Sequence, residues 1–189
     1  FQSTGAFTGL TAGNYTVVSE DANGCQFPVT VLITEPTLLI SNIVNSNNTQ
    51  CYNSCDGAID ISVSGGSLPY VFSWTGPNSF SEITEDIGSL CAGNYDILVS
   101  DNNSCSTSLS VTINEPSEVL LTTSSVNSNC GQSDGAVSVS ASGGTISTDY
   151  FYEWYQAGLL IGSTANVPNL AAGSYDVVVI DDNNCSASA

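Results

Sequence analysis

Apolar and polar residues alternate along most of the chain, a pattern typical of strands with one buried face. In the segment GAIDISV, Ile59, Ile61 and Val63 fall on one face and polar residues fall between them. The same alternation predicts further inward-facing sets: Tyr70, Phe72 and Trp74; Tyr95, Ile97 and Val99; Leu109, Val111 and Ile113; Val137, Val139 and Ala141; Tyr150, Tyr152 and Trp154; Tyr175, Val177 and Val179. No segment of useful length has a 3.6-residue period. The sequence therefore predicts an all-β protein.

The chain is internally repeated. The stretch LTAGNYTVVSEDANGC, which begins at Leu10, has close counterparts that begin at Leu90 and Leu170, so the period is 80 residues. A fixed period of this length defines the domain organisation before chain length does. The landmarks divide the chain into the C-terminal part of a repeat (1–36), a complete repeat (37–116) and a nearly complete repeat (117–189). Because the pattern starts and stops partway through a repeat, we expect this chain to be a segment of a longer array.

Each repeat has the features of an immunoglobulin-like β-sandwich. About seven short strands fit into 80 residues, with an aromatic strand in the middle. The Leu-x-Ala-Gly-x-Tyr segment resembles the tyrosine corner of that fold, in which a tyrosine hydroxyl bonds back to the backbone before strand F. The predicted structural core residues are Tyr15, Tyr95 and Tyr175 at the corners and Trp74 and Trp154 on strand C. We therefore expect tandem immunoglobulin-like sandwiches of about 80 residues in a linear array.

The turns between the last two strands also repeat. Residues 21–24 (Asp-Ala-Asn-Gly) predict a hairpin turn, because Asn-Gly tolerates the positive φ angles that such turns need. Its counterparts are residues 101–104 and 182–184, where asparagine is expected to supply the same tolerance. Glu-Pro at 35–36 and 115–116 ends the last strand, since proline cannot extend the ladder. Consecutive repeats should therefore be joined with almost no linker.

Charge narrows the function classes. The chain has 18 acidic residues and no lysine, arginine or histidine, which gives a net charge of −18. Without cations to meet phosphate, nucleic-acid binding and attachment to anionic membranes are disfavoured. No apolar run approaches the ~20 residues that a membrane-spanning helix needs. The usual catalytic bases and oxyanion donors are also missing, so the sequence predicts that the protein is not an enzyme.

The seven cysteines indicate disulfides and an oxidising, extracytoplasmic setting. Cys55 and Cys91 occur only in the middle repeat, where the third repeat has Ser133 and Ala171. Because both cysteines are absent together, we expect them to pair. The two loops that carry them, between strands A and B and between strands E and F, also share one pole of the predicted sandwich.

The remaining cysteines allow two pairings. Within repeats, Cys51 would pair with Cys105 and Cys130 with Cys185. Strand F–G turns and A–B loops lie at opposite poles of such a sandwich, however, and a disulfide needs Cα atoms within about 7 Å. The F–G turn of one repeat faces the A–B loop of the repeat before it, which favours Cys51–Cys185. Cys25 and Cys105 would then each pair with a cysteine of an earlier repeat, and Cys130 would pair with a cysteine of a later repeat. The pairing within repeats remains open if residues 46–55 fold back along the domain.

The ordered motifs CDGAIDISVSGGSLPYVFSW, LCAGNYDILVSDNNSC and VTINEP resemble the SprB-type repeat of Bacteroidetes gliding-motility adhesins. The third repeat departs from the pattern, because STDYFYEW lacks the Pro-Tyr pair. The resemblance implies a very large, secreted, extracellular cell-surface protein that is exported by the type IX system and used in attachment or gliding. It also implies partners: neighbouring repeats, other copies of the protein in a filament, and a surface glycan or substratum that other regions of the protein contact.

Two further features of the sequence each allow two interpretations. Acidic residues recur at turns and could bind Ca²⁺ as a cofactor; the candidate ligands are Asp56, Asp101, Asp134, Asp181 and Asp182. We favour the interpretation that these side chains stabilise their own turns. Apolar residues also recur at outward strand positions: Val18, Leu98, Val178, Val71 and Phe151. The sequence thus supports a structural stalk of an adhesin or, alternatively, a segment of an extracellular filament that packs through these outer faces.

Overall fold

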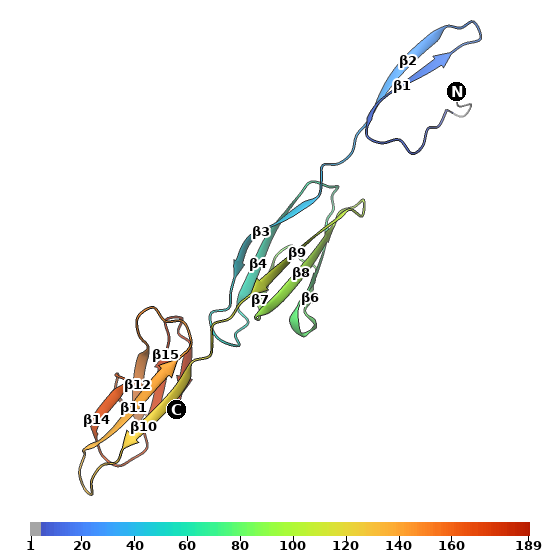
Figure 1. Ribbon diagram of the computed structural model, residues 1–189. Helices are drawn as coiled ribbons and strands as arrows, with labels where there is room; N and C mark the ends of the chain where they lie inside the picture. Colours follow the sequence, from blue (N-terminus) through green and yellow to red (C-terminus); the bar gives the residue numbers. More distant parts are fainter. Residues whose placement is uncertain (1–4) are drawn as a thin grey trace.

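The computed structural model describes residues 5–189 and has three β units in a row (Figure 1). Within these residues every regular element is a strand, apart from one short 3₁₀ turn. The all-β expectation is therefore confirmed. No helix in the described part of the chain has the length and hydrophobicity needed to cross a bilayer.

The first unit is a hairpin of β1 (Gly13–Glu20) and β2 (Gln26–Ile33). The two strands are antiparallel and in register from Gly13 opposite Ile33 to Glu20 opposite Gln26. Val17, Val29 and Val31 lie on the face that is buried in the second unit, yet here they are exposed. In the described residues this unit has no second sheet to cover that face.

The second unit has seven strands in two sheets, as expected for an immunoglobulin-like sandwich. Its elements are β3 (Ile40–Asn47), β4 (Gly57–Ser64), β5 (Val71–Thr75), η1 (Pro77–Ser79), β6 (Ser81–Glu82), β7 (Ile87–Leu90), β8 (Gly93–Ser100) and β9 (Ser106–Ile113). One sheet has the order β3-β4-β7 and the other β6-β5-β8-β9. In the usual lettering these are strands A-B-E and C′-C-F-G.

The core of this unit lies between the two sheets. Alternate residues of β4, β5, β8 and β9 point into it, because successive side chains on a strand face opposite ways. Trp74 is completely buried and donates a hydrogen bond from its indole Nε1 to the Thr84 carbonyl oxygen at 3.0 Å. Tyr95 and Ile59 are also almost fully buried beside it. The predicted inward sets of this repeat therefore form one apolar cluster.

The third unit repeats this architecture with strands β10 (Leu120–Val126), β11 (Gly135–Ser142), β12 (Phe151–Gln156), β13 (Leu159–Gly162), β14 (Asn166–Leu170), β15 (Asp176–Ile180) and β16 (Ser186–Ser188). Its sheets have the orders β10-β11-β14 and β13-β12-β15-β16. Trp154 is 2% exposed, and its indole donates to the Thr164 carbonyl oxygen at 3.1 Å. The core of this unit includes Val139, Val177 and Val179.

The units are joined end to end. The chain leaves the second unit after β9 and enters the third at β10, with only residues 114–119 between them. The loop between β3 and β4 (the A–B loop, residues 48–56) therefore comes next to the turn between β15 and β16 (the F–G turn, residues 181–185) (Figure 1). This junction holds the chemistry described next.

Candidate functional site

The F–G turns of the second and third units are built around a buried carboxylate. Asp101 is 5% exposed, and its Oδ1 accepts backbone N–H groups from Asn103 at 2.9 Å and Cys105 at 2.8 Å. Asp181 is 1% exposed and accepts from Asn183 and Cys185 at 2.9 and 2.8 Å. This local bonding places each cysteine at a fixed point at the end of its turn.

Each buried carboxylate also holds the neighbouring loop between strands B and C. Asp101 Oδ2 accepts the backbone N–H of Ser67 at 2.9 Å. Gly66 must be glycine here, because its φ is +60° and an added Cβ would lie 2.8 Å from Asp101 Oδ2. Burial raises the pKa of Asp101, but the hydrogen bonds from Cys105, Ser67 and Asn103 outweigh burial and hold the pKa below its ordinary value. In the third unit, Asp181 accepts from Thr145 at 2.8 Å in the same way.

The turn geometry corrects one detail of the sequence analysis. The residue with positive φ is the fourth of each turn: Gly24 at +83°, Ser104 at +67° and Asn184 at +64°. Neither Asn102 nor Asn103 has positive φ, and the third turn begins at Asp181 and not at Asp182. The reason is that the first aspartate of each turn, Asp21, Asp101 or Asp181, accepts backbone N–H groups from within the turn and so fixes its phase. A serine at position 104 then accepts the left-handed conformation that asparagine was expected to take.

At the opposite pole, the A–B loop of the second unit is tied to the end of its own last strand. Thr49 donates its backbone N–H to the Asn114 carbonyl oxygen at 3.0 Å, and Asn53 donates its own to Glu115 Oε2 at 2.7 Å. Asp56 closes the loop from inside by accepting the Ser54 hydroxyl at 2.7 Å and the Gln50 backbone N–H at 3.1 Å. The hydrogen bond from Ser54, followed by that from Gln50, lowers the pKa of Asp56.

A disulfide between Cys55 and Cys91 fastens the same loop to the turn that precedes β8. The Cys91 carbonyl oxygen accepts the Tyr95 hydroxyl at 2.9 Å. This bond is the tyrosine corner of the second unit. Equivalent bonds run from Tyr15 to the Thr11 carbonyl and from Tyr175 to the Ala171 carbonyl, both at 2.8 Å. The three predicted corner tyrosines thus make the same contact.

A second disulfide joins the two repeats. Cys51 in the A–B loop of the second unit pairs with Cys185 in the F–G turn of the third, with Cα atoms 5.6 Å apart. Beside it, the Asn183 side chain donates to the Gln50 carbonyl oxygen at 3.0 Å. The repeats are therefore linked by a disulfide and a hydrogen bond in addition to the chain itself. We call this link the inter-repeat disulfide.

The alternative pairing within repeats is not formed. Cys51 lies beside the end of β9, since Thr49 bonds to Asn114, whereas Cys105 lies before its start. Eight strand residues separate these two points, a span of roughly 26 Å at about 3.3 Å per residue. The Cys130–Cys185 pair is absent because Cys185 is already bonded. Cys25, Cys105 and Cys130 are exposed and form no disulfide within residues 5–189.

The structure does not gather the acidic residues considered as calcium ligands. Within residues 5–189, no three aspartate, glutamate, cysteine or histidine side chains lie close enough together to hold a metal ion. Asp134 accepts hydrogen bonds from the backbone and side chain of Asn129, and Asp182 accepts from the backbone and hydroxyl of Ser147. Asp56 and Asp134 thus bond within their own loops, and Asp101 and Asp182 also bond to the neighbouring loop between strands B and C.

The outward apolar positions lie as expected on the faces away from the core. Val71 is 62% exposed, Phe151 64%, Val18 51% and Leu98 48%, and Val178 is partly exposed. They lie on strands of the larger sheet in each complete unit and on the hairpin of the first. The outer face of this sheet therefore presents a few separated apolar side chains along the row.

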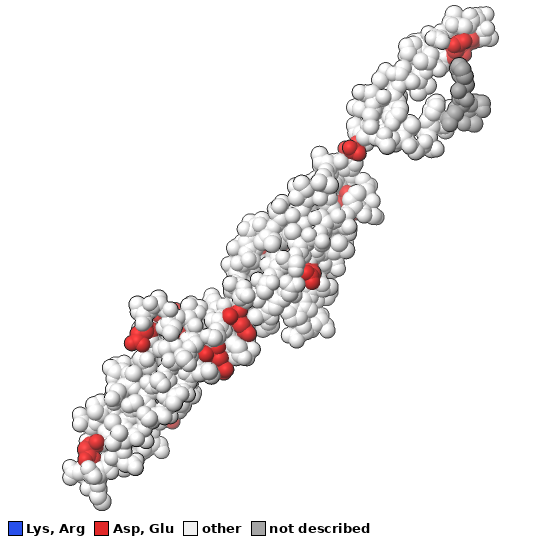
Figure 2. All heavy atoms as spheres, viewed as in Figure 1, with Lys and Arg blue, Asp and Glu red and all other residues white. Residues whose placement is uncertain are grey.

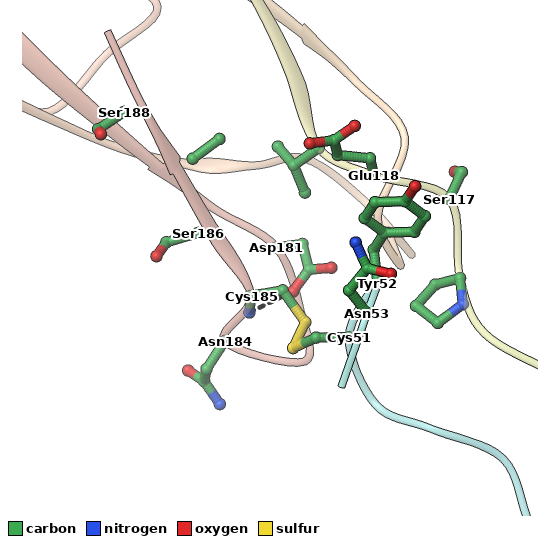
Figure 3. A pocket seen from close by; sticks show the side chains of 13 residues that line it. Cys51, Tyr52, Asn53, Ser117, Glu118, Asp181, Asn184, Cys185, Ser186 and Ser188 are labelled. Carbon is green, nitrogen blue, oxygen red and sulfur yellow. Dashed lines mark hydrogen bonds between the residues drawn. A yellow bond between two sulfur atoms is a disulfide. The ribbon is translucent and has the colours of Figure 1, made fainter. Parts of the chain in front are cut away.

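The junction contains a cleft that no pattern in the sequence had indicated. It has a volume of about 600 Å³ and lies between the A–B loop of the second unit, the linker and the F–G turn with β16 (Figure 3). We call it the junction cleft. Its side chains include Tyr52, Asn53, Glu118, Asn184, Ser186 and Ser188. The signal that could have found it is a contrast: these loops repeat, but Tyr52, Glu118 and Asn184 do not match their counterparts in the other copies.

Comparison with known proteins supports the repeat assignment. The family model described as "SprB repeat" matches residues 43–79 and 122–159, equivalent portions of the second and third units. This match confirms the resemblance inferred from the motifs. No curated protein matches the chain.

Among solved structures, the chain is similar to the three N-terminal domains of the bacteriophage RB49 Highly Immunogenic Outer Capsid protein (Hoc). The two are 19% identical, with a TM-score of 0.46 over 80% of this chain. The chain spans 57% of that Hoc structure.

Proposed function

We propose that this chain is part of the stalk of a secreted cell-surface adhesin, in which neighbouring repeats are fixed end to end. The inter-repeat disulfide carries this proposal. A single peptide linker lets two domains rotate about its backbone bonds, and domain motion is the ordinary expectation for small interfaces. A second covalent connection beside the linker removes most of that freedom. The role would be to hold other regions of the protein away from the cell.

The family resemblance extends the proposal to attachment or gliding motility and to export from the cell. Disulfides persist in oxidising compartments, which supports an extracellular location. The role would be non-enzymatic, because histidine, lysine and arginine are absent from the chain. Ligand recognition at the surface would then belong chiefly to other parts of the protein.

Small-angle X-ray scattering tests the stalk. The oxidised protein should scatter as a single extended body, and the C51S/C185S variant should show a broader and, on average, shorter distribution of interatomic distances. The control is C55S/C91S, which removes a disulfide inside one repeat and should leave the distribution unchanged. Identical profiles for the wild type and C51S/C185S would contradict a stiffening role. Peptide mapping without reduction must also recover the 51–185 cross-link and not a 51–105 cross-link.

A filament is the second candidate. The exposed side chains of Val71, Phe151 and Leu98 favour it, because they recur on the same face of successive units. In this case copies of the protein would pack side by side through the larger sheets. Analytical ultracentrifugation over a wide concentration range separates the two: a stalk segment stays monomeric, whereas a filament segment associates, and V71S/F151S should abolish that association.

A further inference from the structure

The junction cleft has fixed walls. On one side, the A–B loop is held by Thr49 and Asn53 to the end of its own unit. On the other, Asp181 anchors the F–G turn through backbone N–H groups. The inter-repeat disulfide crosses between these walls and forms part of the lining. A ligand that entered the cleft would not have to order either loop, which lowers the entropic cost of binding.

The polar side chains that line the cleft are available to a ligand. Tyr52 is 42% exposed, and in Figure 3 its ring lies next to Asn53 and Glu118, across the cleft from Ser186 and Ser188. None of these five side chains makes a hydrogen bond to another residue of the described chain. Together they offer an aromatic face, an amide, a carboxylate and two hydroxyls, which can both donate and accept.

Architecture does not explain the choice of Tyr52, Asn53 and Glu118 at their positions in the cleft. The junction's structural residues recur in the other copies: Asp181 corresponds to Asp101, Cys185 to Cys105 and Pro116 to Pro36. Among the cleft residues, Ser186 and Ser188 recur as Ser106 and Ser108, but Tyr52, Asn53 and Glu118 do not recur. The position of Tyr52 is taken by Gly131 in the next repeat, and that of Glu118 by Leu38 in the preceding one. The repeat folds with either residue, so the fold leaves these positions free to serve recognition at one junction.

Charge selects the class of ligand. No lysine, arginine or histidine is present to pair with an anion, and acidic side chains gather around the junction between the second and third units (Figure 2). A phosphate, sulfate or carboxylate ligand would be repelled. An uncharged ligand with many hydroxyl groups fits better. Its donors would meet Glu118 and Asn53, and an apolar C–H face would pack on the Tyr52 ring, which combines apolar area with a polar end.

We propose that the junction cleft binds an uncharged saccharide. This site goes beyond the stalk, because it places ligand recognition within the repeats themselves. In an array, such a site would be present only at junctions whose loops carry the aromatic and acidic residues. The stalk and the site can fail separately, since scattering tests the first and glycan binding tests the second.

The test is an array of immobilised oligosaccharides that includes uncharged, sialylated and sulfated members, probed with the oxidised protein. Any uncharged glycan that binds is then titrated by isothermal calorimetry. We expect binding to one or more uncharged glycans, and at least about tenfold weaker binding by Tyr52→Ala, the fold-change that corresponds to roughly 1.4 kcal/mol. Glu118→Leu, which introduces the residue found at position 38, should also weaken binding and keep the repeat fold.

Phe151→Ala is the matched control, because it removes an exposed aromatic side chain from the outer face of the third unit. Its affinity should equal that of the wild type. The proposal is overturned if no uncharged glycan binds, if only sialylated or sulfated glycans bind, or if Tyr52→Ala and Phe151→Ala weaken binding equally. Binding that requires Ca²⁺ and is unaffected by Tyr52→Ala would also overturn it, in favour of a metal-dependent site elsewhere.

Discussion

Removal of the inter-repeat disulfide should destabilise both of the repeats that it joins. The two cysteines are 134 residues apart in sequence, but the loop that the bond closes is shorter when one repeat is folded. With the second unit intact, hydrogen bonds hold the A–B loop against Asn114 and Glu115. When the third unit unfolds, its chain therefore becomes a flexible loop whose two ends, Asn114 and Cys185, are still held together by the disulfide.

The length of this loop sets the expected magnitude. In the chain-entropy model, a closed loop of about 70 residues stabilises the folded state by about 4 kcal/mol at 25 °C, and typical disulfides contribute about 2–4 kcal/mol. We expect C51S/C185S to lower the unfolding free energy of the third unit by about 2–4 kcal/mol. The second unit should lose a similar amount, because its loop from Cys51 to Asn114 has about 60 residues.

The protein carries its own reporters for this measurement. It has two tryptophans, with Trp74 in the core of the second unit and Trp154 in the core of the third. Labelling with 5-fluorotryptophan gives one ¹⁹F resonance for each unit, which can be followed through a urea titration without a further mutation. For each resonance, the unfolding free energy of wild type minus that of C51S/C185S gives the stability that the corresponding unit loses.

The C55S/C91S variant is the control, because its disulfide lies within the second unit. It should lower the urea concentration at the midpoint of the unfolding transition that Trp74 reports and leave the midpoint that Trp154 reports unchanged. The reasoning fails if C51S/C185S shifts the Trp154 transition by less than about 1 kcal/mol, well below the range for a loop of this size. It also fails if the two double variants affect the two units equally.

Four substitutions and the addition of Ca²⁺ test the local structure. Tyr95→Phe removes the bond to the Cys91 carbonyl and should lower the stability of the second unit by about 1 kcal/mol, measured by urea denaturation; an unchanged midpoint would argue against the corner. Gly65→Ala should cost more, about 1–3 kcal/mol, since φ is +76° and the new Cβ would lie 1.9 Å from the Leu38 carbonyl oxygen. Gly88→Ala, which meets nothing within 4 Å, should be close to neutral in the same assay. The pKa of Asp101 in the folded protein lies below its ordinary value, so the stability that the ionised carboxylate contributes is present above about pH 4 and is lost as the pH falls through the lowered pKa. The melting temperatures of wild type and Asp101→Asn should therefore converge at low pH. A difference in melting temperature that stays constant with pH would contradict this role. Added Ca²⁺ should leave the melting temperature unchanged, since the turn carboxylates already accept hydrogen bonds, and a rise would revive the calcium interpretation.

Much of the fold followed from the sequence because the same physical constraint acts in every copy. The alternation around Trp74 and Tyr95 is strict, since each of these strands has one face against the core. The shortest strands left no comparable signal. β6 consists of Ser81 and Glu82, both exposed, and an edge strand of this kind needs no apolar alternation. Its place in the sheet is fixed by pairing with β5, which no local pattern records.

The site was only partly predictable for a similar reason. Disulfide geometry favoured the Cys51–Cys185 pair over pairs at opposite poles, but the sequence left the pairing within repeats open. The junction cleft depends instead on how two repeats meet, and its key side chains, Tyr52 and Glu118, come from segments far apart in the sequence. The left-handed conformation at Ser104 also escaped local propensity, because the buried Asp101 imposes it from within the turn.

The inter-repeat disulfide also determines how the chain would respond to tension. A pull along the covalent chain passes from Cys51 directly to Cys185 and bypasses residues 52–184. Even if both repeats unfolded, those residues could not lengthen the molecule. At roughly 3.4 Å per extended residue, about 450 Å of chain is withheld from the stretched path. Between Cys51 and Cys185 the molecule would thus behave under load as a tether of nearly fixed length. Reduction of the inter-repeat disulfide would make this segment extensible, apart from the residues that the Cys55–Cys91 disulfide encloses.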